Sequence, residues 1–333
     1  MDIKKTKKIN ILLILAVLLI CNLHCYGQSS KNLTHSEQKQ LKDAADLFFS
    51  SGNFNAALLN YTKLLQYSPS DKTLPELYLK QGICYENIGL YDKSIKSLNS
   101  ALQLDKTNPV IHLNLGIVLQ KSGLFSESVE EYKLSIDYNI SDKYIAYLGL
   151  GKLYQKSGIN SEAINYYQKA LLIKPGPDIY NNLSKCYESL HDWKSAGRML
   201  FESIKLNESL EDEIHLAYLY YIQKDYDAAI KTLGRLSDNN PGRMDIKLHL
   251  AMNYFKKNDY ASSQQILKKL IKSNPDNGFL YYLFTLNLYF ENKNSILVEQ
   301  EIKKSIKNST SNNLKEYSTA FLKFLSSKQN IPK

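Results

Sequence analysis

Residues 109–142 read PVIHLNLGIVLQKSGLFSESVEEYKLSIDYNISD, and this stretch decides the fold class of the whole chain. Apolar residues on both sides of Gly123 follow the three-to-four-residue spacing of one helical face. Gly123 itself stands where the chain must turn, and glycine tolerates the backbone of a tight turn. Small residues stand in both halves, at Gly116 and Ser128, so two helix backbones can come close there. The stretch therefore predicts two antiparallel helices joined by a short turn.

The same pattern recurs along the chain every 33 to 37 residues. Each unit has a small residue in its first helix, a turn-forming or polar residue seven positions later, and a second small residue twelve positions after the first. Such a helix pair cannot bury both of its apolar faces alone, so consecutive units must stack. The first small residues are Ala45, Gly82, Gly116, Gly151, Ser184, Ala217 and Ala251. The turn residues are Gly52, Gly89, Gly123, Gly158, His191, Lys224 and Asn258.

This order of small and aromatic residues resembles the tetratricopeptide repeat, a helix-turn-helix unit of 34 residues. Seven units in tandem, from Leu41 to Pro275, match the pattern at several positions each. The resemblance implies an all-α fold, a right-handed superhelical solenoid of about seven repeats over residues 38–275. It also implies a protein that binds other proteins or peptides, without naming a partner.

Beyond Pro275 the pattern weakens but continues. Residues 276–310 are expected to form a degenerate eighth repeat, with Thr285 at the small position. Residues 311–328 are expected to form a C-terminal capping helix, because Leu314, Tyr317, Phe321 and Leu325 fall on one helical face. The last repeat of a solenoid has an apolar surface with no following repeat against it, and a capping helix covers that surface.

The N-terminus has the pattern of an export signal. Four lysines precede an unbroken apolar stretch from Ile11 to Cys21, which is short for a membrane span. Small residues at Cys25 and Gly27 suit cleavage after Gly27, which would make residues 1–27 a signal peptide and residues 28–37 a leader. The sequence therefore predicts an exported protein, periplasmic or at the cell surface or secreted.

Two alternatives to a cleaved signal stay open, an uncleaved anchor and a lipidated cysteine. Cys21 and Cys25 are the candidate cysteines, although Ile20 and His24 stand where a lipoprotein signal has a small residue. Association with a membrane is expected only if this segment is retained or lipidated.

The net charge and the cysteines indicate which partners and which covalent links to expect. The formal net charge of +9 falls to +6 without residues 1–27, which is too weak to indicate a nucleic-acid partner. Cys84 and Cys186 would occupy the same position of two repeats that lie three apart. Because bridging needs Cα atoms within about 7 Å, we expect two buried core thiols and no disulfide.

No catalytic signature, cofactor motif or metal-binding motif stands in the sequence. Gly149-Leu150-Gly151-Lys152 lacks the Ser or Thr that ends a phosphate-binding loop, and it is expected to be a close-packing site inside a helix. His215 and His249 fall at equivalent positions without cysteine or carboxylate partners nearby in sequence, so a metal pair is not expected. We therefore predict that the chain is not an enzyme and holds no cofactor.

The first helices of a stacked solenoid line a concave surface, which is where a partner is expected. In the sixth and seventh repeats this surface is aromatic and apolar, whereas the middle repeats carry lysines that would favour acidic flanking residues. The alternative is that the apolar side chains pack between neighbouring first helices or under the terminal helix. The predicted groove residues are Ile214, Tyr218, Tyr221, Ile222, Leu248, Met252 and Phe255, with Lys121, Lys152, Lys156 and Lys185.

One known binding mode of the family is the carboxylate clamp, which holds chaperone C-termini. The residues of the first repeat do not favour it. The clamp uses lysine and asparagine, and this chain has Lys42 but Asp46 at the asparagine position. The leading hypothesis is a non-enzymatic interaction scaffold of the periplasm or cell surface. The alternative is a membrane-associated, lipoprotein-like subunit that assembles or tethers an envelope complex.

Overall fold

A computed structural model describes residues 33–67, 72–291 and 295–329. These residues form seventeen α-helices and no β-strand, so the prediction of an all-α repeat fold is confirmed. The predicted signal peptide, residues 1–27, lies outside the described residues, as do Cys21 and Cys25 and the first part of the predicted leader.

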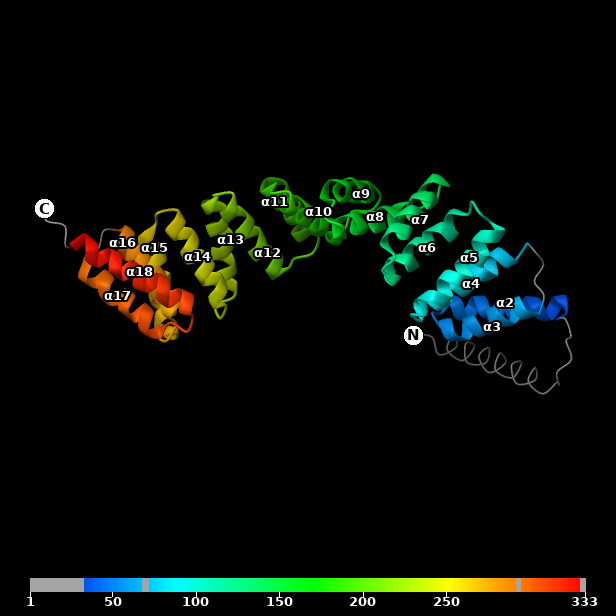
Figure 1. The fold of residues 1–333 in the computed structure, drawn as a ribbon, viewed down its shortest axis with the longest axis horizontal. Helices are drawn as coiled ribbons and strands as arrows, with labels where there is room; N and C mark the ends of the chain where they lie inside the picture. Colours follow the sequence, from blue (N-terminus) through cyan, green and yellow to red (C-terminus); the bar gives the residue numbers. More distant parts are fainter. Residues whose placement is uncertain (1–32, 68–71, 292–294, 330–333) are drawn as a thin grey trace. The chain divides into compact units, whose positions relative to one another are not determined.

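The chain divides into two compact units, and the first ends at Lys174 and the second begins at Pro175. In the first unit, each odd-numbered helix packs against the even-numbered helix before it, and consecutive pairs stack (Figure 1). The helices of the first unit are α2 (His35–Ser50), α3 (Phe54–Gln66), α4 (Leu74–Asn87), α5 (Tyr91–Leu104), α6 (Pro109–Ser122), α7 (Phe125–Asp137), α8 (Tyr144–Lys156) and α9 (Asn160–Ile173).

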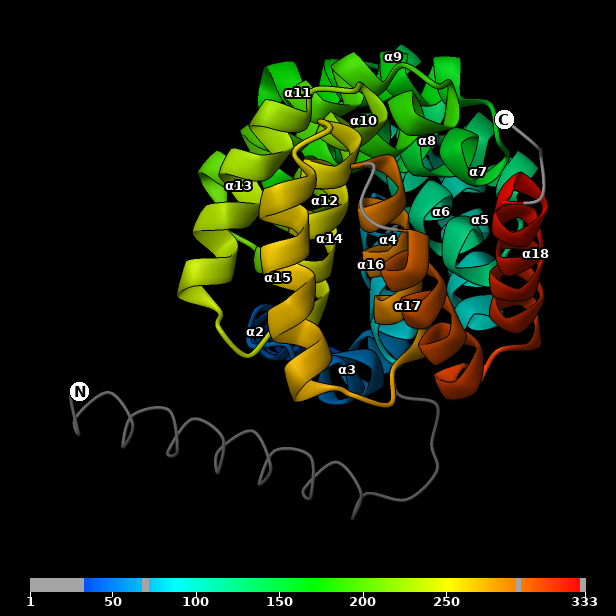
Figure 2. The same cartoon turned by 90° about the vertical axis from the view of Figure 1, so that its left-hand side faces the viewer.

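The second unit has the same arrangement and ends in one additional helix, α18, which lies alongside α17 (Figure 2). Its helices are α10 (Pro177–Ser189), α11 (Trp193–Leu206), α12 (Leu210–Ile222), α13 (Tyr226–Asn239), α14 (Met244–Lys256), α15 (Tyr260–Ser273), α16 (Gly278–Phe290), α17 (Ser295–Asn308) and α18 (Asn312–Gln329).

Small residues make the contact between the two helices of each repeat. The second small residue of every repeat from the first to the seventh is fully buried. Where it is a serine, its hydroxyl donates to the carbonyl of the first small residue, as from Ser94 to Gly82 at 2.7 Å and from Ser263 to Ala251 at 2.8 Å. Larger side chains would separate the two backbones and break these hydrogen bonds.

Glycines in the first unit make room for buried tyrosine rings. Tyr132 lies against both Gly116 of its own repeat and Gly149 of the next, where an added Cβ would meet its ring at 2.7 and 2.5 Å. Tyr167 fills the corresponding space beside Gly151. Gly149 and Gly151 therefore lie inside α8 as packing positions, which confirms that this segment is not a phosphate-binding loop.

The turn between the two helices of each repeat needs one residue with a left-handed backbone. All seven predicted turn residues have positive φ, from 76 to 84° at the four glycines and from 58 to 66° at His191, Lys224 and Asn258. A residue with a Cβ is less stable than glycine in this conformation.

The two ends of the repeat array are formed by specific contacts. Helix α2 begins at His35 because Thr34 and Glu37 form a reciprocal capping box, and this start lies within the segment expected to be a leader. At the other end, Leu325 is buried against the core of the eighth repeat, and Ser318 of α18 hydrogen-bonds Ser305 of α17 at 3.0 Å. Tyr317, which the sequence placed on the buried face of α18, is 65% exposed.

Replacing Gly149 by alanine is expected to destabilise the first unit by about 1–3 kcal/mol, because the new Cβ would overlap the buried ring of Tyr132. Gly234→Ala is the matched control, since no atom lies within 4 Å of the added Cβ and alanine favours a helix by up to about 1 kcal/mol. Urea unfolding of both variants measures the two changes, and equal effects would contradict this packing.

Lys224→Gly is expected to stabilise the second unit by about 0.5–1 kcal/mol, because glycine adopts the positive φ of this turn without strain. Lys231→Gly, the same substitution inside α13, is expected to cost about 1 kcal/mol. Thermal unfolding of both variants measures whether stability rises in Lys224→Gly and falls in Lys231→Gly. A loss of stability at both positions would show that the turn does not depend on its left-handed residue.

Candidate functional site

The first helices of the sixth and seventh repeats, α12 and α14, carry the predicted apolar groove residues, which we call the aromatic face. Tyr218 is 52% exposed and the others are half-buried. Ile214 and Leu248 also pack against neighbouring core clusters, so these two side chains contribute to the core as well as to the surface. The aromatic face consists of Ile214, Tyr218, Tyr221, Ile222, Leu248, Met252 and Phe255.

Two adjacent cavities open on the aromatic face, and both contact Tyr221 and Met252. The first measures about 130 Å³ and lies between α12 and α14. The second measures about 240 Å³ and lies between α14 and α16. The floor of the first includes Leu233 and that of the second Leu267, residues 34 positions apart in the second helices of successive repeats. The two cavities are therefore the same feature of the repeat, present twice in succession.

Aromatic rings border the second cavity on one side. Phe255 contacts Phe290 with the ring centroids 5.6 Å apart, and Tyr260 lies 5.7 Å from Phe255. Phe290 is 52% exposed, so this cluster reaches the surface. Exposed aromatic side chains beside an apolar cavity are typical of sites that hold another protein.

A histidine lines one of the two cavities and a lysine the other. His249 lines the first cavity and Lys256 the second, and no acidic residue lines either. His215, on the neighbouring helix, donates a hydrogen bond from Nε2 to the carboxylate of Glu188 at 3.0 Å, and its ring centroid lies 6.3 Å from that of Tyr218. A ligand with a negative charge beside its apolar part fits this surface.

The terminal helix covers part of the eighth repeat but does not line these cavities. Tyr289 of α16 contacts Phe321 of α18, with the ring centroids 5.3 Å apart. Leu283 and Leu286 of α16 line the second cavity instead. The alternative that the terminal helix covers the apolar surface therefore applies to one side of α16, and not to the cavities of the aromatic face.

The predicted lysines lie in different environments. Lys121 forms an ion pair with Glu86, and the ammonium group of Lys156 lies 4.1 Å from the ring centroid of Phe125. Lys152 and Lys185 are exposed. Lys121, Lys152 and Lys156 belong to the first unit, whereas Lys185 and the aromatic face belong to the second. The predicted role of these lysines in binding stays a prediction.

A network of charges joins the first helices of the first and second repeats, at the place where a carboxylate clamp would lie. Asp46 accepts hydrogen bonds from Tyr61 at 2.6 Å, Lys80 at 2.8 Å and Lys42 at 3.2 Å, and both lysines also contact Glu76. Burial raises the pKa of Asp46, but the hydrogen bonds from Lys80, Tyr61 and Lys42 outweigh burial and hold it below its usual value. The two lysines are thus neutralised by acids of the chain itself.

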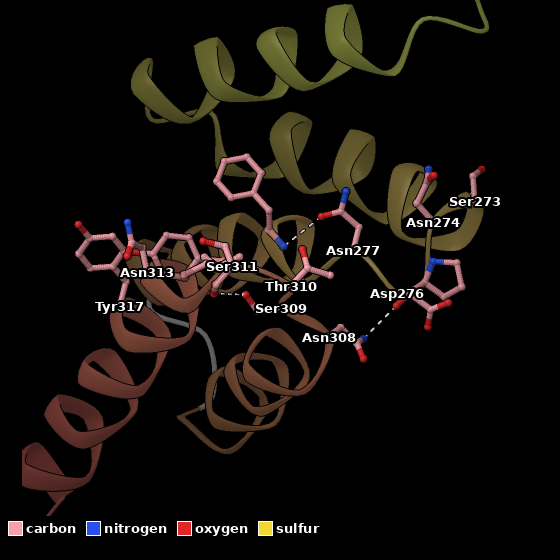
Figure 3. A pocket seen from close by; sticks show the side chains of 15 residues that line it. Ser273, Asn274, Asp276, Asn277, Asn308, Ser309, Thr310, Ser311, Asn313 and Tyr317 are labelled. Carbon is pink, nitrogen blue, oxygen red and sulfur yellow. Dashed lines mark hydrogen bonds between the residues drawn. The ribbon is translucent and has the colours of Figure 1, made fainter.

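A larger pocket, of about 870 Å³, lies near the C-terminus between the α15–α16 loop and the start of α18 (Figure 3). Its polar side chains bond to nearby backbone: Asn308 donates to the carbonyl of Pro275 at 3.0 Å, and Asn277 accepts from the amide of Phe279 at 3.1 Å. An added Cβ at Gly278 would lie 2.7 Å from the backbone of Ser305 and Ser309. These contacts hold the junction between the eighth repeat and α18.

The two cysteines of the described chain are buried and unpaired, as predicted. Burial raises the pKa of the Cys84 thiol to about 12 and that of Cys186 to about 11, so neither is a nucleophile at neutral pH. The residues described contain no cluster of three or more His, Cys, Asp or Glu side chains that could hold a metal ion. Among the helices described, none has the length and apolar composition of a membrane span.

Sequence reasoning missed two residues that line the cavities, Asn253 in the first and Asn287 in the second. Both stand two positions after the small residue of their repeats, where the first six repeats have an apolar residue. This break in the repeat pattern is the signal that would have found them.

Family models match the chain over most of its repeats. A model described as intraflagellar transport protein 56 matches residues 121–324, which is more than half of the chain, and one described as TPR repeat matches residues 87–123. The chain belongs to the tetratricopeptide repeat family. The longer match, over residues 121–324, is to a model that is named for intraflagellar transport protein 56. That name describes the named protein and assigns no role to this chain. Comparison with curated proteins finds no match.

Solved structures that match with a TM-score above 0.5 share the fold of this tetratricopeptide repeat protein. The C-terminal part of a TPR repeat-containing protein from Cytophaga hutchinsonii is 19% identical with a TM-score of 0.57, and the match covers 72% of this chain and 97% of that one. The Naa15/Naa10 complex bound to HypK-THB matches at 13% identity and a TM-score of 0.57, over 84% of this chain and 44% of that one. MamA matches at 27% identity and a TM-score of 0.46, over 51% of this chain and 92% of that one.

Proposed function

We propose that this tetratricopeptide repeat protein is a non-enzymatic interaction scaffold that binds an apolar segment of a partner protein on its aromatic face. The observation that carries the proposal is the pair of equivalent cavities beside the exposed ring of Tyr218. An apolar side chain that enters a cavity leaves water and fills space that the folded chain leaves open.

The charge of the surface selects among apolar partners. Since His249 and Lys256 line the cavities without an acidic neighbour in the lining, a segment with an acidic residue beside its apolar side chains is favoured. A segment rich in lysine would meet the like charge of Lys256. We therefore propose an acidic, apolar peptide segment as the occupant.

We further propose that the scaffold acts in the periplasm or at the cell surface. The lysines and the apolar stretch of residues 1–27, followed by small residues at a cleavage position, support export. The alternative, a lipoprotein-like tethering subunit of an envelope complex, requires a retained and acylated cysteine.

The double variant Tyr218→Asp, Met252→Asp is expected to lose the partner, because two carboxylates would enter the apolar surface beside both cavities. The mature protein, residues 28–333, is used to capture proteins from the native envelope fraction, and captured proteins are identified by mass. Leu172→Asp, Leu206→Asp is the control, since it adds the same charge at exposed apolar positions away from the cavities. Partners that a folded Tyr218→Asp, Met252→Asp protein retains would contradict binding on the aromatic face.

Processing of the N-terminus tests the proposed location. Intact-mass analysis of the protein purified from its native envelope is expected to show a chain that begins at Gln28. A mass that includes Met1 would contradict cleavage and export by this signal. An acylated N-terminal cysteine would support the tethering subunit in place of the soluble scaffold.

A further inference from the structure

The pocket between the α15–α16 loop and the start of α18 differs in its lining from the cavities of the aromatic face (Figure 3). It measures about 870 Å³, and its lining combines aromatic rings with many amide and hydroxyl side chains. Among the described residues that line it, none is lysine, arginine or histidine, and Asp276 alone has a charge. The rings belong to Phe279, Tyr282 and Tyr317, of which Phe279 is 38% exposed and Tyr317 65%. The size is that of a small-molecule site.

Two of the lining residues replace an ion pair of the preceding repeat. In that repeat Arg243 pairs with Asp245 at 2.8 Å. The residues 34 positions later are Asn277 and Phe279, so an amide and an exposed ring stand where the preceding repeat has two charges. The loop backbone is the same in both repeats, because the amides of Arg243 and Asn277 each donate to the carbonyl three residues earlier, at 3.1 and 3.2 Å. The difference between the two loops is therefore one of side-chain chemistry.

Close packing beside the pocket holds its two sides together. An added Cβ at Gly278 would lie 2.7 Å from the backbone of Ser305 and of Ser309. The hydroxyl of Ser305 donates to the carbonyl of Gly278 at 2.9 Å, and Asn308 donates to the carbonyl of Pro275 at 3.0 Å. The loops on both sides are thus fixed in the folded chain. A pocket that exists before its ligand arrives binds with little loss of conformational entropy.

Several polar groups of the lining take no part in these contacts. Within the described residues, the side chains of Asp276, Thr310 and Asn313 form no hydrogen bond or ion pair. The same holds for the phenolic hydroxyls of Tyr282 and Tyr317. Amides and hydroxyls both donate and accept, whereas an ionised carboxylate accepts only. The pocket therefore offers donors and acceptors together, next to exposed aromatic rings.

These groups favour a saccharide over other small ligands. Each hydroxyl of a sugar ring donates and accepts, and one face of many sugar rings consists of C–H groups that pack on an aromatic ring. A purely apolar ligand would bury the amides and hydroxyls without partners. An anionic ligand would find no cation in the lining and would meet the negative charge of Asp276.

We propose that this pocket binds a neutral saccharide. The rings of Phe279 and Tyr317 pack on the sugar, and Asp276, Thr310 and Asn313 bond to its hydroxyls. The pocket shares no residue with the aromatic face or with the two cavities there, so the inference goes beyond the proposed function and does not depend on it.

Calorimetric titration of the protein with four neutral trisaccharides, maltotriose, cellotriose, mannotriose and triacetylchitotriose, tests the proposal. At least one of them is expected to bind. Tyr317→Ala is expected to weaken that binding by at least about tenfold, because the ring that packs on the sugar is lost. Tyr317→Phe keeps the ring and is expected to retain most of the affinity. Phe201→Ala is the control, since Phe201 is an aromatic residue of α11 that is 44% exposed and lies outside the pocket.

The absence of binding by all four trisaccharides at millimolar concentration would overturn the proposal. Binding that is equally strong in Tyr317→Ala would also overturn it, because the sugar would then lie elsewhere on the protein. Tyr317→Ala is expected to keep the proteins captured through the aromatic face, so the two proposals stand or fail separately.

The charge of the ligand gives a second test. Trigalacturonic acid, an anionic trisaccharide, is expected to bind at least about tenfold more weakly than the best neutral one. Asp276→Asn is expected to narrow this difference, because it removes the negative charge and keeps a group that bonds to hydroxyls. Equal affinity of the natural protein for the anionic and the neutral trisaccharide would contradict a site for neutral saccharides.

Discussion

The structure depends on the close approach of two helix backbones at one pair of small residues in each of the first seven repeats. In the second repeat, for example, the hydroxyl of Ser94 donates a hydrogen bond to the carbonyl of Gly82 on the other helix at 2.7 Å. This contact fixes how far apart the two helices of a repeat lie and which faces remain for the next repeat. The aromatic side chains then fill the spaces beside it, as Tyr132 does against Gly116 and Gly149. Without the small residues the helices would still form, but the repeats would not stack in this way.

The fold could be predicted from sequence because its determinants recur. One small residue is weak evidence, but seven at a nearly constant spacing define the helices, the turns and their order. Even the turns at His191 and Lys224, which lack glycine, lie where the repeat predicts a turn and adopt the same left-handed backbone as the glycine turns. The first residue of the first helix was harder to predict from sequence, because it is set by a local hydrogen-bonded cap at Thr34 and not by the repeat pattern.

The site could be predicted only in part. Tyr218 and Met252 were placed on the right helices because their spacing from the small residue identifies a helical face. Ile214 and Leu248 share that face yet also pack into the core, since helical periodicity does not show how deep a neighbouring helix lies. The cavities, with Asn253 and Asn287 among their lining residues, arise from the packing of three helices in the first case and four in the second. No pattern within a single helix reveals them.

The central claim is that a partner contacts the chain at the aromatic face of the second unit. Site-specific photo-crosslinking tests this contact directly: p-benzoylphenylalanine replaces Tyr218 in one protein and Leu172, an exposed residue of the first unit, in another. The account predicts a crosslinked partner from position 218 and none from position 172. A product from position 172 alone would contradict it.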